Sequence, residues 1–265
     1  MRFLMLADIH ANLEALEAVL EDAGTRSYET IIFLGDAVGY GPDPGAVIDK
    51  LEALNARCIL GNHEAMMLGL PNAEVLDGPA GQAIRWQRER LSVPQLEILR
   101  KWPERRKYSG NLSNDLNLTN ASEGIPAEFF MVHGSPKNLF DYIDNLANAR
   151  AAFADWGGRL AFVGHTHKPG VYATINSPNG EWTRWQGMED EHNRLPMPPK
   201  ARWIANPGSV GQPRDGNPHA SYGIYDYAKG MFEVHRVKYD LETTQQKIRA
   251  ANLPDMLAAR LEVGK

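Results

Sequence analysis

Cysteine is almost absent from this chain, since Cys58 is the only one among 265 residues. A single thiol cannot form an intramolecular disulfide, which favours a reducing compartment, and its place in an apolar segment predicts that it is buried. Long apolar runs are missing as well, because no stretch reaches the roughly 18 residues that a membrane span needs. No signal peptide precedes the first apolar segment, which begins at Phe3. We therefore expect a cytoplasmic protein without a membrane partner.

Excess positive charge is also lacking: 28 Lys and Arg stand against 33 Asp and Glu, for a net charge of -5. Proteins that bind nucleic acids usually carry a basic face, so we expect no specific nucleic-acid binding. The hydrophobic fraction of 43% and the charged fraction of 23% are ordinary for a globular protein. We expect one domain, residues 1–265, that acts on a small substrate; the composition indicates no particular oligomeric state.

What the chain does have is five short apolar segments that end in polar residues. Segments of this kind are typical of strands in a covered parallel sheet, and open α/β sheets bind ligands beyond the carboxyl ends of such strands. The segments and the residues that follow them are 3–7 with Asp8 and His10, 30–34 with Asp36, 56–60 with Asn62 and His63, 129–132 with His133, and 160–163 with His165 and His167. We expect all five to deliver these side chains to one edge and to form a metal site there.

The remaining segments predict an α/β chain with a change of character in its second half. Helices are expected over 11–22 and 44–54, which with the strands form parallel crossovers, and a helical region over about 64–106 flanks the site. A further helix is expected over 145–156. From about residue 168 the pattern becomes antiparallel β, and two helices, near 241–251 and 254–261, close the chain.

Some stretches carry weaker signals. Residues 107–128 are polar and predict a hairpin or an irregular loop, and the Pro-rich stretch 187–200 predicts a loop. Pro178-Asn179-Gly180 is a strong hairpin turn. The basic cluster formed by Arg100, Lys101, Arg105, Arg106 and Lys107 is interpreted as a solvated helix end, with an anion-binding patch as the alternative.

The polar endings, read in order, resemble a known signature. D-x-H, G-D, G-N-H-E, V-H-G and G-H-T-H resemble the motifs of the calcineurin-like metallophosphoesterases, and the stretch 206–211, N-P-G-S-V-G, resembles the closing loop of their small bacterial and archaeal members. The resemblance implies a four-layer α/β/β/α sandwich with two mixed β-sheets and a centre of two divalent ions. It implies these ligands: Asp8, His10, Asp36 and His167 for the first ion, and Asp36, Asn62, His133 and His165 for the second.

Asp36 would bridge the two ions. Imidazole and carboxylate ligands suit Mn²⁺, which we expect first, and also Fe, Zn²⁺, Ni²⁺, Co²⁺ or Mg²⁺. Because only Asp8 and Asp36 are negatively charged, two divalent ions leave the site positive, which suits a phosphate anion. The expected activity is hydrolysis of phosphodiesters, or of phosphomonoesters, by a metal-bridging hydroxide.

Other activities of the same family stay as alternatives. They are a symmetrical dinucleoside-tetraphosphate hydrolase and a Ser/Thr-type protein phosphatase; the latter normally carries an Arg shortly after G-N-H-E, whereas Ala65-Met66-Met67 follow here. A non-catalytic scaffold predicts gaps in the ligand set, and none is seen. A nuclease predicts a basic groove, which the sequence does not indicate.

Several residues outside the ligand set have candidate roles. His63 adjoins Asn62, and it is expected to be catalytic by protonating the leaving oxygen. Tyr40 and Arg214 are candidates for binding substrate. Glu64 either starts a helix or orients His63. The loop residues Ser135 and His219 are interpreted as a structural serine and a surface histidine.

Overall fold

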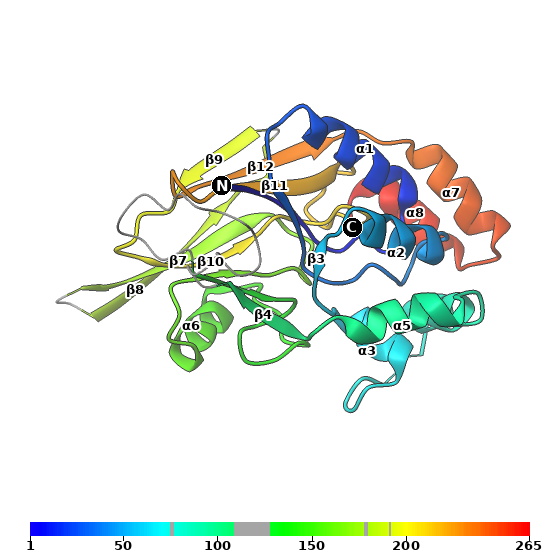
Figure 1. The fold of residues 1–265 in the computed structure, drawn as a ribbon, viewed down its shortest axis with the longest axis horizontal. Coiled ribbons are helices and arrows are strands. Elements are labelled where there is room, and N and C mark those ends of the chain that lie inside the picture. The colour runs from blue at the N-terminus through cyan, green and yellow to red at the C-terminus, as the bar shows by residue number, and fades with distance from the viewer. Residues whose placement is uncertain (75–76, 109–127, 178–179, 191) are drawn as a thin grey trace.

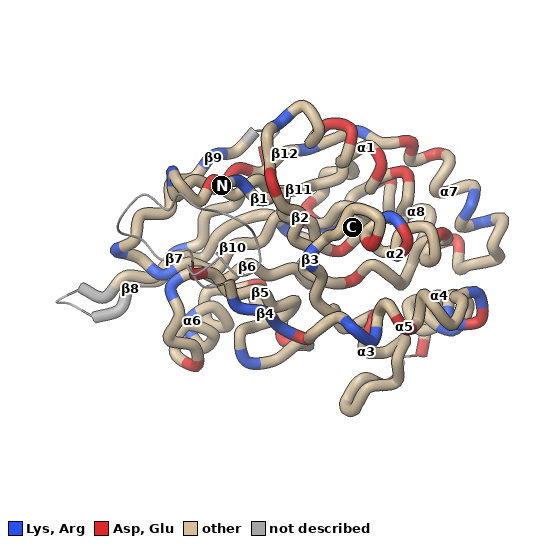
Figure 2. The backbone as a smooth tube through the Cα atoms, in the orientation of Figure 1, with Lys and Arg blue, Asp and Glu red and all other residues tan. Residues whose placement is uncertain are grey.

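The computed structural model describes residues 1–265 except 75–76, 109–127, 178–179 and 191. It has two six-stranded mixed sheets with helices on their outer sides (Figure 1), so the predicted four-layer α/β/β/α architecture is confirmed. Lys and Arg are interspersed with Asp and Glu along helices and strands (Figure 2). Among the described residues, no helix has the length and apolar character that crossing a membrane requires.

The first sheet combines three parallel strands near the N-terminus with three antiparallel strands from the second half. Its order is β3 (Arg57–Cys58), β2 (Thr30–Phe33), β1 (Arg2–Leu6), β11 (Ala220–Asp226), β12 (Met231–Val237) and β9 (His192–Pro196). Strand β1 is parallel to β2, with Phe3 opposite Thr30, and antiparallel to β11, with Leu4 opposite Ile224. These pairings fix where β1 and β2 end, which places the residues that follow them.

The second sheet has a parallel centre and antiparallel edges. Its order is β4 (Arg105–Tyr108), β5 (Phe129–Val132), β6 (Leu160–Phe162), β10 (Arg202–Asn206), β7 (Gly170–Ser177) and β8 (Gly180–Gly187). Strands β5, β6 and β10 are parallel to one another. The predicted hairpin turn lies partly outside the described residues, but β7 and β8 are paired antiparallel up to Ser177 and Gly180.

Helices lie on the outer sides of both sheets and beyond one end of them (Figure 1). They are α1 (Leu13–Gly24), α2 (Pro44–Ala53), α3 (Asn62–Leu68), α4 (Pro79–Arg88), α5 (Val93–Lys101), α6 (Leu146–Asp155), α7 (Leu241–Ala250) and α8 (Asp255–Val263). Local capping explains several starts: the Asn12 side chain accepts a hydrogen bond from the Ala15 amide at the start of α1, and Asn145 does the same for α6.

Three buried apolar clusters correspond to the three contacts between four layers. One lies between the first sheet and its helices and includes Leu16 and Phe33. A second lies between the two sheets, where Phe3 and Phe129 meet edge to face at 5.1 Å. The third packs Phe153 of α6 on the second sheet. Cys58 belongs to the first cluster, so its predicted burial is confirmed.

Two sequence predictions about the middle of the chain are wrong in detail. The helical region ends at Lys101 rather than near residue 106, because Trp102 precedes Pro103 and a residue before proline avoids the helical conformation. Arg105, Arg106 and Lys107 then form strand β4, paired with β5, so the basic cluster is divided between a helix end and a strand. Most of the predicted irregular stretch 107–128 lies outside the described residues.

The stretch 187–200 was expected to be a loop, yet it contains strand β9. This strand pairs with β12 at the edge of the first sheet, with Arg194 opposite Glu233. An edge strand has one unpaired side and commonly carries charged residues and proline, so its sequence lacks the alternation that identifies an inner strand. The pairing partner, which is distant in sequence, decides the conformation.

Candidate metal centre

The predicted ligands follow strands of both sheets. Asp8 and His10 follow β1, Asp36 follows β2, and Asn62 begins α3 directly after β3. The histidines of the second sheet are His133 after β5 and the pair His165 and His167 after β6. The expectation that all five endings lie at one edge therefore needs correction: three belong to one sheet and two to the other, and the site forms where the carboxyl ends of both meet.

The backbone at this site is held in an unusual conformation. Five of the seven predicted ligands have a positive φ, and they are Asp8 (54°), His10 (50°), Asp36 (65°), His165 (68°) and His167 (59°). For residues other than glycine this conformation costs about 1–3 kcal/mol each, and such strain gathers at functional sites. The strained backbone that directs these side chains inward therefore lowers the stability of the folded state.

The side chains form two groups that share one carboxylate. Asp8, His10, Asp36 and His167 form the first, and Asp36, His133 and His165 form the second; within each group the candidate ligand atoms all lie within 4.8 Å of one another. Every member is buried. Asp36 is the residue common to both, which is the position that the sequence analysis assigned to a bridge.

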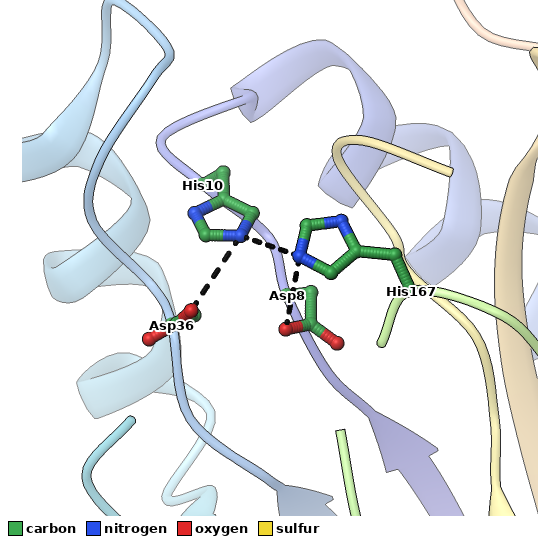
Figure 3. Close-up of side chains that lie close together, drawn as sticks. All are labelled: Asp8, His10, Asp36 and His167. Carbon is green, nitrogen blue, oxygen red and sulfur yellow. Dashed lines mark hydrogen bonds and ion pairs between the residues drawn. The ribbon is translucent and has the colours of Figure 1, made fainter. Parts of the chain in front are cut away.

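In the first group, two imidazoles converge above two carboxylates (Figure 3). Nε2 of His10 lies 3.1 Å from Nε2 of His167. The Nδ1 atoms of these rings lie 2.9 Å from the Val38 carbonyl and 2.5 Å from the Gln212 carbonyl, respectively. Each Nδ1 must then carry the ring proton and donate a hydrogen bond to a carbonyl. Both Nε2 atoms are left unprotonated, as acceptors that face each other. Such an arrangement calls for a cation between them.

The second group repeats this arrangement around His133. Its Nδ1 lies 2.8 Å from the Leu34 carbonyl, and its Nε2 lies 3.0 Å from Oδ1 of Asn62 and 3.2 Å from Oδ2 of Asp36. Nε2 of His165 is buried and has no hydrogen-bond partner among the described residues. Ring nitrogens whose other nitrogen is fixed by a carbonyl are typical metal ligands, so the residues present fit a metal ion here as well.

The charges of the site also favour bound cations. Burial raises the pKa of Asp8 to about 7, and the neighbouring Asp36 adds to the rise. Burial lowers the pKa of His133, but the charges of Asp36 and Asp8 outweigh it and raise that pKa to about 9. Burial also lowers the pKa of His10 and of His167 well below the usual value. The neutral imidazoles of His10 and His167 therefore lie beside two buried carboxylates whose charge a metal ion would compensate.

Comparison with known proteins identifies the family. Residues 1–230 match the model of the calcineurin-like phosphoesterase superfamily domain. The chain belongs to this superfamily. An uncharacterized protein of Methanocaldococcus jannaschii is 33% identical over 268 residues, which cover 98% of this chain and 97% of that protein.

Two solved structures show the same fold over the whole chain. A metallophosphoesterase from Sphaerobacter thermophilus has 35% sequence identity and a TM-score of 0.78, with 100% of both chains covered. A hypothetical protein from Pyrococcus horikoshii has 22% identity and a TM-score of 0.73, with 100% of this chain and 98% of that one covered. The resemblance read from the sequence motifs is therefore confirmed for this calcineurin-like phosphoesterase.

Glu64 holds the loop that carries Asp36. Its carboxylate accepts hydrogen bonds from three backbone amides, those of Asp36 (2.8 Å), Val38 (3.1 Å) and Gly61 (2.7 Å). Burial and the charge of Asp36 raise the pKa of Glu64 to about 7, against these three donors. Of the two predicted roles, the helix-start carboxylate is correct, because Glu64 lies in the first turn of α3 and accepts a hydrogen bond from the amide of Gly61, the residue before the helix. It additionally fixes Asp36.

His63 lies beside both groups without belonging to either. Its Nε2 is 4.0 Å from Oδ2 of Asp36, and its ring centroid is 4.7 Å from that of His10. Nδ1 of His63 is buried and has no hydrogen-bond partner among the described residues. Gly39, with φ +90°, packs so closely that a Cβ there would lie 2.0 Å from this Nδ1. The ring is thus confined at the edge of the centre, with its Nδ1 uncommitted to the described part of the protein.

Both candidate substrate-binding residues lie at the mouth of the centre. The Tyr40 ring is 4.6 Å from the His10 ring and 4.7 Å from the His63 ring, and Nη2 of Arg214 donates to its hydroxyl at 3.3 Å. Tyr142, which sequence reasoning missed, stacks on His165 with centroids 3.8 Å apart and is 46% exposed. No motif marks Tyr142, because it lies in a stretch that reads as loop.

The two loop residues take structural positions. Oγ of Ser135 donates to Asp141 at 2.8 Å and accepts from the Asn138 amide. At His219, the backbone carbonyl accepts a hydrogen bond from Nη1 of Arg236 at 3.3 Å.

Proposed function

We propose that this calcineurin-like phosphoesterase hydrolyses phosphodiesters with two divalent metal ions. The observation that carries the proposal is the pair of buried ligand groups that share Asp36. Asp8, His10, Asp36 and His167 would hold one ion, and Asp36, Asn62, His133 and His165 the other. Mixed imidazole and oxygen ligands suit Mn²⁺ first, with Fe, Zn²⁺, Ni²⁺, Co²⁺ or Mg²⁺ as alternatives.

When bound, such ions supply a nucleophile from water at neutral pH and neutralise the charge of the phosphoryl oxygens. The protein contributes two carboxylates, Asp8 and Asp36, whose combined charge does not cancel that of two divalent ions. The site would therefore attract an anion. Its neutral ligands, Asn62 and the four imidazoles, complete the coordination without repelling the phosphate.

The residues around the centre would act on the substrate itself. His63 is placed beside the centre with a free ring nitrogen, so it would protonate the departing oxygen or stabilise the charge developing there. Arg214 and Tyr40 would orient the phosphoryl group at the mouth of the centre through charged and neutral hydrogen bonds.

The experiment that tests the proposal measures metal content and turnover together. The chelated protein is reconstituted with Mn²⁺, Ni²⁺, Mg²⁺ or Zn²⁺ and assayed on bis(p-nitrophenyl) phosphate. We expect close to two ions per chain and metal-dependent hydrolysis. Asp36→Asn should weaken the binding of both ions and abolish turnover. The control Asp49→Asn, at an exposed position of α2, should change neither metal content nor turnover. A folded protein that binds no metal would contradict the proposal.

A further inference from the structure

Two arginines from separate parts of the chain meet at one aromatic ring. Arg214 lies in the loop that follows β10, and Arg260 lies on α8, beyond residues 1–230 that the family model matches. The guanidinium carbon of each is 5.7 Å from the centroid of the Tyr40 ring. The ring itself lies beside the metal centre, because its centroid is 4.6 Å from that of His10.

Neither guanidinium is neutralised by an acidic side chain. In the described part of the chain, no Asp or Glu oxygen lies within 4.0 Å of Arg214 or Arg260. Nη2 of Arg214 donates to Gln212 at 2.9 Å, but its Nε is buried without a hydrogen-bond partner in the same described part. Nε of Arg260 donates to the main-chain oxygen of Lys265 at 2.5 Å. A buried donor left without an acceptor is unfavourable, so an anion at this place would stabilise the pair.

The two arginines are held in place together. The amide of Gly216, in the loop of Arg214, donates to the carbonyl of Gly264 at the end of α8 at 2.9 Å. Leu257 and Leu261 of α8 are buried in an apolar cluster against which Tyr40 packs. The positions from which the two arginine side chains extend are therefore set by backbone contacts and apolar packing.

Helix α7, which packs against α8, is tied to the loop that carries His10. Oγ1 of Thr244 donates a hydrogen bond at 3.1 Å to the side chain of Asn12, which is two residues after His10 in the sequence. The amide of Arg214 donates to the carbonyl of His167 at 3.3 Å. Burial and the neighbouring Arg214 lower the pKa of Arg260, which is the electrostatic cost of placing two cations together. A structure that maintains this cost next to a phosphoesterase centre favours a negatively charged ligand.

We propose that Arg214 and Arg260 form a second anion subsite, which binds a phosphoryl group adjoining the phosphoester that is cleaved. The substrate class is then a phosphoester that carries a diphosphate or longer polyphosphate, because a single phosphate on the metal ions would not engage Arg260. Guanidinium groups bind phosphate oxygens through paired hydrogen bonds, which makes arginine well suited to this task. The inference rests on the proposed function only for the place of the cleaved bond.

The test compares two ligands that differ by one phosphoryl group. Binding of methylphosphonate and methylenediphosphonate to the full-length, Mn²⁺-loaded protein is measured by calorimetry, with Mn²⁺ in excess over the ligand. We expect the wild-type protein to prefer the diphosphonate. Arg260→Gln should lower this preference about tenfold, since hydrogen bonds to a charged group contribute about 1.5–3 kcal/mol. Arg260→Lys should restore it in part, as charge returns without the planar fork.

The matched control is Arg88→Gln, which removes the same charge from an exposed position in the last turn of α4. It should leave the preference and the melting temperature unchanged. Equal affinities of the wild-type protein for the two ligands, or an Arg260→Gln variant that keeps the wild-type preference, would overturn the inference. Hydrolysis of bis(p-nitrophenyl) phosphate is measured in parallel. If hydrolysis occurs but the wild-type protein does not prefer the diphosphonate, only the subsite is wrong. If the preference exists but no metal form hydrolyses the diester, only the proposed function is wrong.

Discussion

Gly39→Ala offers a direct test of His63, because it perturbs the imidazole without altering a metal ligand. A Cβ at residue 39 would lie 2.0 Å from Nδ1 and 2.7 Å from Cε1 of His63, where ordinary contacts begin at 3.4 Å, so the ring must move by roughly 1.4 Å. The backbone of His63 cannot follow easily, since its amide donates to Oδ1 of Asp36 at 2.9 Å. The ring therefore has to rotate away from the centre.

The size of the effect follows from this displacement. A misplacement of 1 Å in an active site can cost about 10²-fold in rate, and general acid catalysis is typically worth about 10²–10⁴-fold. We expect turnover of an alkyl diester to fall by about 10²-fold. The positive φ of Gly39, +90°, adds conformational strain of roughly 1–2 kcal/mol to the folded state, which should lower the melting temperature independently of catalysis.

Gly69→Ala is the matched control. Gly69 also has a positive φ, +66°, but no atom lies within 4 Å of the position that a Cβ would take. Both variants should lose stability, and only Gly39→Ala should lose turnover. The assay combines kcat, metal content and thermal unfolding for both proteins. Equal turnover of the two variants, or loss of metal from Gly39→Ala alone, would refute the reasoning that confinement of His63 matters for catalysis.

Three further predictions concern the same centre. His63→Gln should keep both ions and lose far more activity on alkyl or nucleoside diesters than on p-nitrophenyl diesters, whose leaving group needs no proton; equal losses would show that His63 is not the acid. Glu64→Gln should destabilise the metal-loaded protein by about 1–3 kcal/mol, because an amide side chain has one acceptor oxygen for three buried N–H groups. The control Glu52→Gln, at an exposed position of α2, should leave the stability unchanged. Urea unfolding measures both. A simple diester should be hydrolysed with a higher kcat/KM than a phosphoserine peptide, since no Arg follows Glu64; comparable values would contradict this.

The sequence was sufficient to bring the candidate ligands together, because each lies directly after a short apolar strand. Asp8, Asp36 and His133 illustrate this: their identity and their place after a strand are local features. The sequence was not sufficient to assign each strand to one of the two sheets. A buried strand such as β5 has the same apolar pattern in either sheet, and only its pairing with β4 and β6 decides. Strand β9 shows the same limit, since its pairing with β12 is not encoded in a local pattern.

The same distinction separates the two arginines beside Tyr40. Arg214 could be chosen from the sequence because it follows the 206–211 loop, which resembles the end of a known motif. Arg260 could not, because it lies on a C-terminal amphipathic helix where an arginine is an ordinary surface residue. Its position near Tyr40 emerges only when Leu257 and Leu261 pack in the cluster that Tyr40 joins. Tertiary packing therefore determines which arginines meet at this ring.

The partners that prepare the histidines for metal are the least visible in the sequence. The Nδ1 atoms of His10, His133 and His167 lie within hydrogen-bond distance of backbone carbonyls, at residues 38, 34 and 212. Every residue has a carbonyl, so no residue type marks these partners, and substitution at those positions would leave the contacts available. Yet these carbonyls fix the tautomer and direct each Nε2 lone pair inward. The motifs therefore specify the ligand types, whereas the backbone path specifies their protonation, and both are required before the cluster can accept cations.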